Sequence, residues 1–213
     1  MLHDLPLPKR IDVDQIVEHS FKDYHVKGFD YLCLQRSPEE TVKLYFFDGD
    51  ISKLPEVVAP HNHRYDFETY VAAGLSENIW FTRSAMRPEH QGTVFNWFEY
   101  RTPLNGGDGF TFAGEEELFE AKRGRFGVGD SYFMHAEDLH TIRIVQNETL
   151  LMLVQFEDIV PLDKPTWTYC ESNAPPLDGL YTKFTADDVT SRLRKFEERT
   201  GLVFSSIGTR NVA

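Results

Sequence analysis

Three histidines in two distant segments have the chemistry and spacing of a metal site. His61 and His63 lie two residues apart, and alternate side chains of an extended strand point to the same face, so both imidazoles can reach one ion. His140 opens a strand-like run that ends at Val145 and could pair beside the first segment. Imidazole ligands suit zinc, iron, copper and nickel, and an added carboxylate shifts the preference toward iron and manganese. These residues therefore predict the chemistry of a divalent metal.

The carboxylate that would complete this site is less well determined by the spacing. Glu68 lies five residues after His63, and this odd interval places it on the opposite face of an unbroken strand. Glu68 can bind the same ion only if a turn intervenes at residues 64–66, and Asp66 within that turn is a rival carboxylate. We favour Glu68 as the fourth ligand. If neither carboxylate binds, the site consists of three histidines.

The segment with the first two histidines resembles the first motif of the cupin superfamily, whose members are small β-barrels. That motif reads His-x-His, three or four residues, Glu, about six residues and Gly. This chain has His61, His63 and Glu68 in that order and then Gly74, with one residue fewer before the glycine.

The second segment resembles the second cupin motif, which has Gly-Asp on a turn, a short hydrophobic strand, often a proline, and a final histidine. Here Gly129 and Asp130 precede the apolar run, and His135 stands where proline is common. The two motifs together cover residues 58–157. The resemblance implies a mainly β fold, namely a cupin-type β-barrel (a double-stranded β-helix or jelly roll). It assigns four residues as metal ligands: His61, His63, Glu68 and His140.

The resemblance also implies a cofactor and an activity. The expected cofactor is one Fe(II) ion, with Mn, Ni or Zn as alternatives, and the expected activity is a dioxygenase reaction in which O2 oxidises a small metabolite, either a thiol or a small organic acid. The three-histidine version of the site resembles the iron site of the thiol dioxygenases in this superfamily. The first motif lacks the His-x-Asp/Glu signature of the 2-oxoglutarate-dependent oxygenases, so that cofactor is not implied. Two alternatives stay open: a non-redox isomerase, decarboxylase or lyase, and a barrel that binds a small molecule without turnover.

Three further residues are candidates for positioning a substrate. A barrel that handles a small organic acid needs a fixed cation, and Arg83 and Arg101 lie on predicted strands where either could serve. Trp97 and Tyr100 fall on opposite faces of their strand by parity, so at most one of them lines the pocket. We name Arg83, Arg101 and Tyr100 as the candidate substrate-positioning residues.

The composition bounds the class of protein and its partners. A chain of 213 residues fits one domain, and 22 basic against 34 acidic residues give a net charge of −12. This charge argues against nonspecific binding to nucleic acid or to an anionic membrane, so the expected partner is a small-molecule substrate. Cys33 and Cys170 form no closely spaced pair, so we expect no disulfide framework and a reducing compartment. No apolar run reaches signal-peptide or membrane-spanning length, which favours a cytoplasmic protein. A homodimer is expected from the resemblance alone.

The hydrophobic pattern predicts a β-rich core behind an N-terminal helix. Apolar residues at near-helical spacing predict that helix over about residues 12–27, ending at Gly28. Short apolar runs between Gly, Pro and Asn turns predict a barrel core over about residues 30–160. Residues 103–117 are rich in turn formers and then acidic, so we interpret them as an insertion over one end of the barrel.

The C-terminal part is predicted to wrap the barrel and then form a helix, over about residues 161–201. Prolines interrupt the first half of this segment, so it is expected to be irregular. Thr185 and Asp188 have the spacing of a capping pair, and Gly201 ends the helix.

Overall fold

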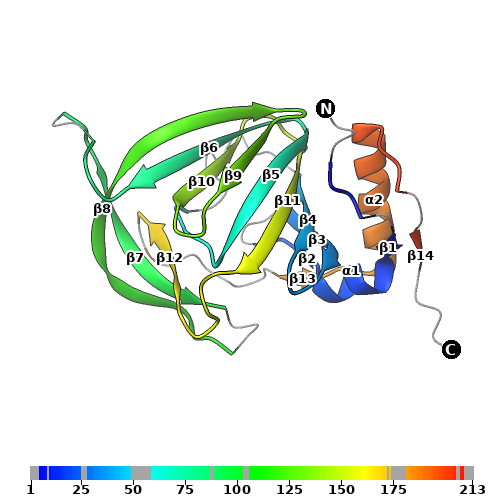
Figure 1. Cartoon of the computed structure of the whole chain (residues 1–213), viewed down its shortest axis with the longest axis horizontal. Coiled ribbons are helices and arrows are strands. Elements are labelled where there is room, and N and C mark those ends of the chain that lie inside the picture. The colour runs from blue at the N-terminus through cyan, green and yellow to red at the C-terminus, as the bar shows by residue number, and fades with distance from the viewer. Residues whose placement is uncertain are drawn as a thin grey trace.

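The computed structural model contains two curled antiparallel β-sheets, and helices lie on the outside of one of them (Figure 1). The structure describes the chain apart from residues 1–4, 9, 25–27, 49–58, 87–88, 103–105, 172, 174–180, 205–206 and 209–213. The mainly β fold class and the barrel-like curl expected from the sequence are confirmed.

The larger sheet has seven strands in the order β13-β2-β3-β4-β11-β5-β9. Its strands are β2 (Phe21–Lys22), β3 (Phe29–Arg36), β4 (Thr41–Phe47), β5 (Tyr65–Ala73), β9 (Ser131–Met134), β11 (Thr149–Asp158) and β13 (Thr182–Lys183). The smaller sheet has five strands in the order β10-β6-β8-β7-β12. They are β6 (Leu75–Thr82), β7 (Thr93–Arg101), β8 (Gly109–Gly127), β10 (Leu139–Ile144) and β12 (Thr166–Cys170).

The segment just before β5 joins the two edge strands of the five-stranded sheet. The backbone of His61 exchanges two hydrogen bonds with that of His140 in β10, at 2.9 and 3.0 Å. On the other side, Tyr169 in β12 donates its N–H to the carbonyl of Pro60, and Asn62 donates to the carbonyl of Trp167. The segment therefore fills the gap between β10 and β12 before the chain enters the seven-stranded sheet as β5.

The central strands of the seven-stranded sheet are buried on both faces. Along β3, Leu32 and Leu34 pack under the helices, whereas Tyr31 and Cys33 alternate with them and point into the barrel. The outer core lies between the helices and the sheet, and among its residues are Leu32, Leu34, Leu44, Phe46, Met152, Val189, Leu193 and Phe196. The inner core joins the two sheets and includes Phe67, Trp80, Tyr132, Met134 and Leu153. Strands buried on both faces read as long apolar runs, which is why β3 and β11 show no polar alternation.

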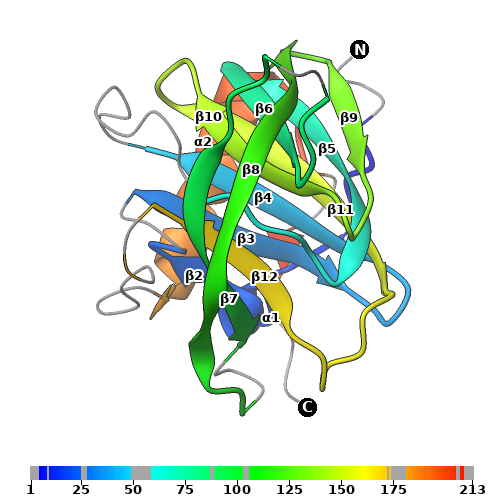
Figure 2. The same cartoon turned by 90° about the vertical axis from the view of Figure 1, so that its left-hand side faces the viewer.

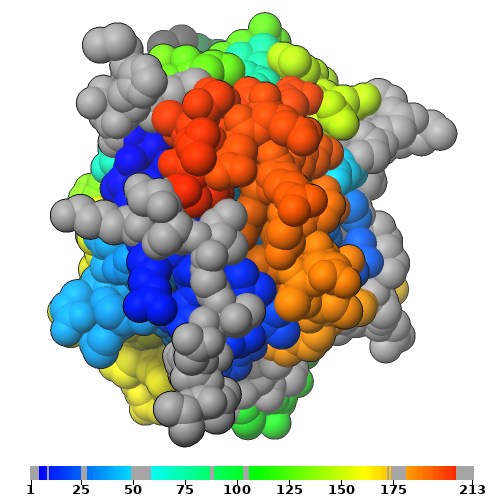
Figure 3. All heavy atoms as spheres, turned by 90° about the vertical axis from the view of Figure 1, so that its right-hand side faces the viewer, coloured from blue at the N-terminus to red at the C-terminus, as the bar shows by residue number. Residues whose placement is uncertain are grey.

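The helices are α1 (Val13–His19) and α2 (Ala186–Thr200), and α2 lies across the outer face of the seven-stranded sheet beside the N-terminal segment (Figure 3). The α2 boundaries agree with the sequence prediction: Thr185 and Asp188 form a capping box, and Gly201 takes the left-handed conformation with φ of 71°. The α1 helix is shorter than the predicted span of residues 12–27, because residues 21–22 pair as β2 instead of continuing the helix. Neither helix has the length and apolar character needed to cross a membrane. A short parallel pair, β1 (Ile11–Asp12) with β14 (Ile207–Gly208), accompanies them.

The prediction of an insertion at residues 103–117 is wrong over most of its length. Residues 109–127 form β8, a 19-residue strand that runs along one side of the molecule (Figure 2) and pairs with both β6 and β7. One face of this strand is solvent-exposed. Its acidic residues therefore belong to the exposed face of a strand and not to a loop. Gly114 accommodates the irregular register opposite Trp97, whose indole would collide with a side chain there. Residues 103–105 lie outside the described residues.

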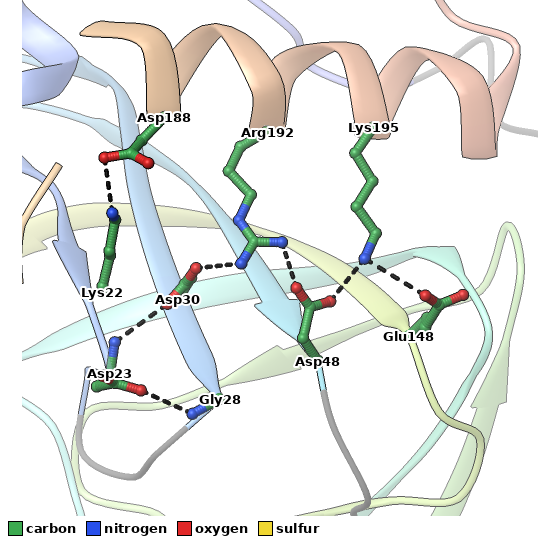
Figure 4. A network of polar contacts seen from close by, with 9 residues as sticks. All are labelled: Lys22, Asp23, Gly28, Asp30, Asp48, Glu148, Asp188, Arg192 and Lys195. Carbon is green, nitrogen blue, oxygen red and sulfur yellow. Dashed lines mark hydrogen bonds and ion pairs between the residues drawn. The ribbon is translucent and has the colours of Figure 1, made fainter. Parts of the chain in front are cut away.

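A network of ion pairs holds α2 on the sheet (Figure 4). Arg192 forms ion pairs with Asp30 of β3 and with Asp48, and Lys195 contacts Asp48 at 2.8 Å and Glu148 at 3.5 Å. Burial raises the pKa of the Asp48 carboxyl, but hydrogen bonds from Lys195 and Arg192 outweigh it, so the pKa lies below its usual value. Asp30 is the most buried member, with 7% of its side chain exposed, and therefore depends most on its partner.

We predict that Arg192→Met lowers the free energy of unfolding by about 2–3 kcal/mol, because it leaves the buried Asp30 carboxylate without its counter-ion. Urea denaturation measures this change. Arg194→Met, at an exposed position of the same helix, is the matched control and should stay within about 0.5 kcal/mol of the wild type. Equal midpoints for the two variants would show that the network contributes no net stability.

Candidate metal centre

Three imidazoles from two segments converge at one point between the sheets. His61 and His63 come from the segment before β5, and His140 is the second residue of β10. One ring nitrogen from each lies within 4.8 Å of the other two, and this is the one such group of three or more potential ligands found among the described residues. The ring centroids of the three pairs are 4.6, 5.0 and 5.1 Å apart. The structure thus brings together the three histidines named from the sequence.

Backbone pairing explains why the rings meet. His61 lies directly opposite His140 in an antiparallel bridge, and paired residues place their side chains on the same face. His63 follows two residues later, and its N–H donates to the carbonyl of Ala136 at 2.9 Å. Main-chain hydrogen bonds therefore bring the three imidazoles together.

For two of the three rings, hydrogen bonds fix which nitrogen faces the centre. The Nδ1 of His140 lies 2.6 Å from Oδ1 of Asn78, a fully buried residue of β6, and the Nδ1 of His61 lies 2.8 Å from the carbonyl of Ala59. Both oxygens are acceptors, so each Nδ1 carries the proton and each Nε2 presents a lone pair. Acceptors of this kind orient metal-binding imidazoles and raise their basicity.

The buried surroundings lower the pKa of two of the rings, which favours the neutral form that binds a metal. Burial lowers the pKa of His61, although its hydrogen bond to Ala59 partly offsets this. Burial also lowers the pKa of His140 well below its ordinary value, and the neighbouring His61 lowers it further.

The spacing of the nitrogens fits a small divalent ion. The Nε2 atoms of His63 and His140 are 2.9 Å apart. Two imidazole nitrogens that bind one ion at right angles, each at about 2.1 Å, lie about 3 Å from each other. Imidazole nitrogen donors suit zinc, iron, copper or nickel.

Glu68, favoured above as the fourth ligand, is not brought to the histidines. The β5 strand begins at Tyr65 and continues without a break through Glu68. No turn therefore separates Phe67 from Glu68, and the two side chains lie on opposite faces of the strand. Phe67 is the residue that faces the centre, with its ring 4.6 Å from that of His63. Glu68 points to the other face, where it accepts a hydrogen bond from Ser131 Oγ at 3.0 Å. The rival Asp66 accepts from the N–H of Ala136 at 2.7 Å and holds the turn before β10.

The three candidate positioning residues have their contacts elsewhere. Arg83 donates to Tyr169 Oη at 2.9 Å and forms an ion pair with Glu116 at 3.2 Å. Tyr169 is adjacent to Thr168, the residue paired with His61, so its side chain points to the opposite face of β12. Arg101 forms an exposed ion pair with Asp108 at 2.6 Å.

Tyr100 stacks on Phe110 of the neighbouring strand, with ring centroids 4.6 Å apart. The barrel interior beside the histidines is lined instead by residues that the sequence analysis did not name. Among them are Lys43, Tyr65, Phe67 and Asn78. The one available signal was parity, which places Phe67 on the face of His63.

Comparisons with known proteins identify distant structural likenesses. No protein-family model and no curated protein matches the chain. Among solved structures, KdgF from Halomonas sp. has a TM-score of 0.39 and 16% identity over 65% of this chain and 88% of that one. Hydroxypropylphosphonic acid epoxidase from S. wedmorenis has a TM-score of 0.38 and 14% identity over 67% of this chain and 58% of that one, so the match spans less than two thirds of the epoxidase. A cupin superfamily protein from Desulfitobacterium hafniense DCB-2 has a TM-score of 0.34 and 12% identity over 60% of this chain and 76% of that one. A cupin is thus among the solved structures that match the chain, and at these TM-scores and identities the likenesses carry no argument about its activity.

We predict that Asn78→Ala weakens metal binding by about 10- to 100-fold, because His140 loses the acceptor that orients it. Competition with a chromophoric chelator measures the affinity. Ser76→Ala is the matched control, since Ser76 is equally buried on the same face of β6 and its hydroxyl has no hydrogen-bond partner. Unchanged affinity in Asn78→Ala would remove Asn78 from the site.

We predict that Glu68→Gln leaves metal affinity unchanged, whereas His63→Ala abolishes stoichiometric binding. The same competition assay compares the two variants. Loss of metal from Glu68→Gln would instead support the four-ligand site of the first cupin motif and contradict the position of Glu68 on the far face of β5.

Proposed function

We propose that the chain is a mononuclear metal enzyme that binds Fe(II) through His61, His63 and His140 and uses O2 to oxidise a small metabolite, either a thiol or a small organic acid. The observation that carries this proposal is the convergence of three imidazoles beside a buried aromatic cluster, with no carboxylate of the described residues joining them. An iron ion held there would supply redox chemistry with O2 and keep open positions for substrate and O2.

The surrounding side chains support this chemistry by excluding water. Phe67 packs against two of the histidines: its ring centroid lies 4.6 Å from that of His63 and 5.7 Å from that of His140. Trp80 and Tyr132 continue the same buried cluster toward the five-stranded sheet. A dry, mostly apolar interior protects reactive species from side reactions with solvent.

The residues of the interior favour oxidation over proton transfer. A non-redox isomerase or lyase needs an acid or base beside the ion. In the part of the chain that the structure describes, no Asp or Glu belongs to the histidine cluster, and Phe67 occupies the direction that a carboxylate ligand from β5 would take. This distribution leaves the ion without a carboxylate base, and so supports the redox proposal over a non-redox enzyme that uses such a base.

Elemental analysis of protein purified without chelator, followed by oxygen uptake after anaerobic Fe(II) loading, tests the proposal. We expect near-stoichiometric iron in the wild type, and O2 consumption on adding small thiols or organic acids. His61→Ala and His140→Ala should lose both, because each removes one of three ligands.

His19→Ala is the matched control, since it removes a histidine from α1 on the outside of the barrel. Zinc or nickel without oxygen uptake would identify the non-redox enzyme instead. A wild type that binds no metal would leave only a small-molecule-binding barrel.

A further inference from the structure

One lysine is buried inside the barrel close to the metal centre. Lys43 lies on the inner face of β4 and is 6% exposed. It is paired with Leu153 of β11, which in turn is paired with Thr69 of β5, so it faces the same interior as the residues that follow His63. Lysine is almost never this buried unless it has a partner.

The contacts of Lys43 are aromatic and neutral. Its Nζ donates to Tyr65 Oη at 3.2 Å and lies 4.8 Å from the ring centroid of Tyr65 and 5.6 Å from that of Tyr31. No ion pair joins Lys43 to an Asp or Glu among the described residues. An ammonium group has three N–H donors, and one hydrogen bond to a phenol does not compensate its charge.

This position differs from that of the other cations considered for substrate binding. Arg83 and Arg101 each have a carboxylate partner, Glu116 and Asp108 respectively. Burial lowers the pKa of the Lys43 amine to about 8, so the amine is still mainly protonated at pH 7. Asp158, opposite Tyr65 on β11, raises this pKa from a distance but forms no ion pair with the amine. A buried ammonium that no described carboxylate contacts directly is suited to bind an anion.

Tyr65 connects this charge to the metal centre. Its ring lies 5.5 Å from that of His63, and its hydroxyl is the group that Lys43 contacts. A molecule bound between Lys43 and the histidines would therefore lie against Tyr65, with aromatic walls around it and a cation at one end.

We propose that Lys43 binds the carboxylate of the substrate, so that the enzyme acts on small monocarboxylates whose reacting group is held at the three-histidine centre. The binding of a carboxylate by Lys43 stands by itself, whereas the reaction at the three-histidine centre rests on the proposed function. A single ammonium among aromatic rings matches a singly charged carboxylate, whereas a phosphate dianion requires several donors.

Calorimetric titration of the Fe(II)-loaded protein under nitrogen with propionate and benzoate tests the proposal. The matched neutral amides, propionamide and benzamide, and inorganic phosphate serve as comparison ligands. We expect at least one carboxylate to bind, with the amides and phosphate weaker by about tenfold or more, because a hydrogen bond to a charged group contributes that much.

Lys43→Met should lower carboxylate affinity by about tenfold or more, because it removes the charge and keeps the length of the side chain. Lys122→Met is the matched control: Lys122 also lies over an aromatic ring, that of Trp80 at 4.1 Å, but is solvent-exposed. Urea denaturation and metal content of Lys43→Met should equal those of the wild type, which would show that its effect is not one of folding or of metal loss.

The outcomes separate this inference from the proposed function. Carboxylate binding that depends on Lys43, in a protein without oxygen uptake, would support the anion site and refute the dioxygenase. Oxygen uptake with carboxylate affinity equal in the wild type and Lys43→Met would refute the role of Lys43. Failure of both carboxylates to bind, or a preference for phosphate, would also overturn it.

Discussion

The backbone pairing of His61 with His140 is the constraint on which the rest of this structure depends. Its two hydrogen bonds place a segment between β10 and β12, and the same bridge puts two imidazoles on one face. Because the chain then continues directly into β5, the metal centre lies where the two sheets meet. The geometry of the site is thus a consequence of the register between the backbone segments that carry the histidines.

The helices contribute to the site indirectly, because they bury the outer face of the seven-stranded sheet. The α2 helix covers the outer face with Val189, Leu193 and Phe196, and its ion pairs with Asp30 and Asp48 fix its position there. Because the helices cover the outer face, the sheet stays buried there while its inner face carries aromatic rings and a charged group. A polar residue within such a strand, as Lys43 is in β4, stands out against an otherwise buried apolar run.

Strand parity and two short motifs were enough to find the three histidines, but not their surroundings. The interval between His61 and His63 is independent of the fold around it, whereas Asn78 reaches His140 only through the register of β6 with β10. The same parity argument placed Glu68 on the far face of β5, and the structure agrees with the parity and not with the motif. The hydrophobic pattern did not predict the β8 strand, because one of its faces is solvent-exposed and its charged residues resemble those of a loop.

The charges of the interior connect the metal centre with Lys43. Imidazole is uncharged when it binds a metal, so three such ligands would leave both positive charges of a divalent ion uncompensated, and Lys43 adds a third in the same low-dielectric space. Among the described residues, no carboxylate belongs to the histidine cluster or pairs with Lys43. On the proposed function, a substrate that carries a carboxylate at one end and a second, metal-binding anionic group at the other would compensate both ends of the site. Such a substrate would bind in one orientation only, because its two ends meet different partners, and that orientation would bring its reacting group to the metal.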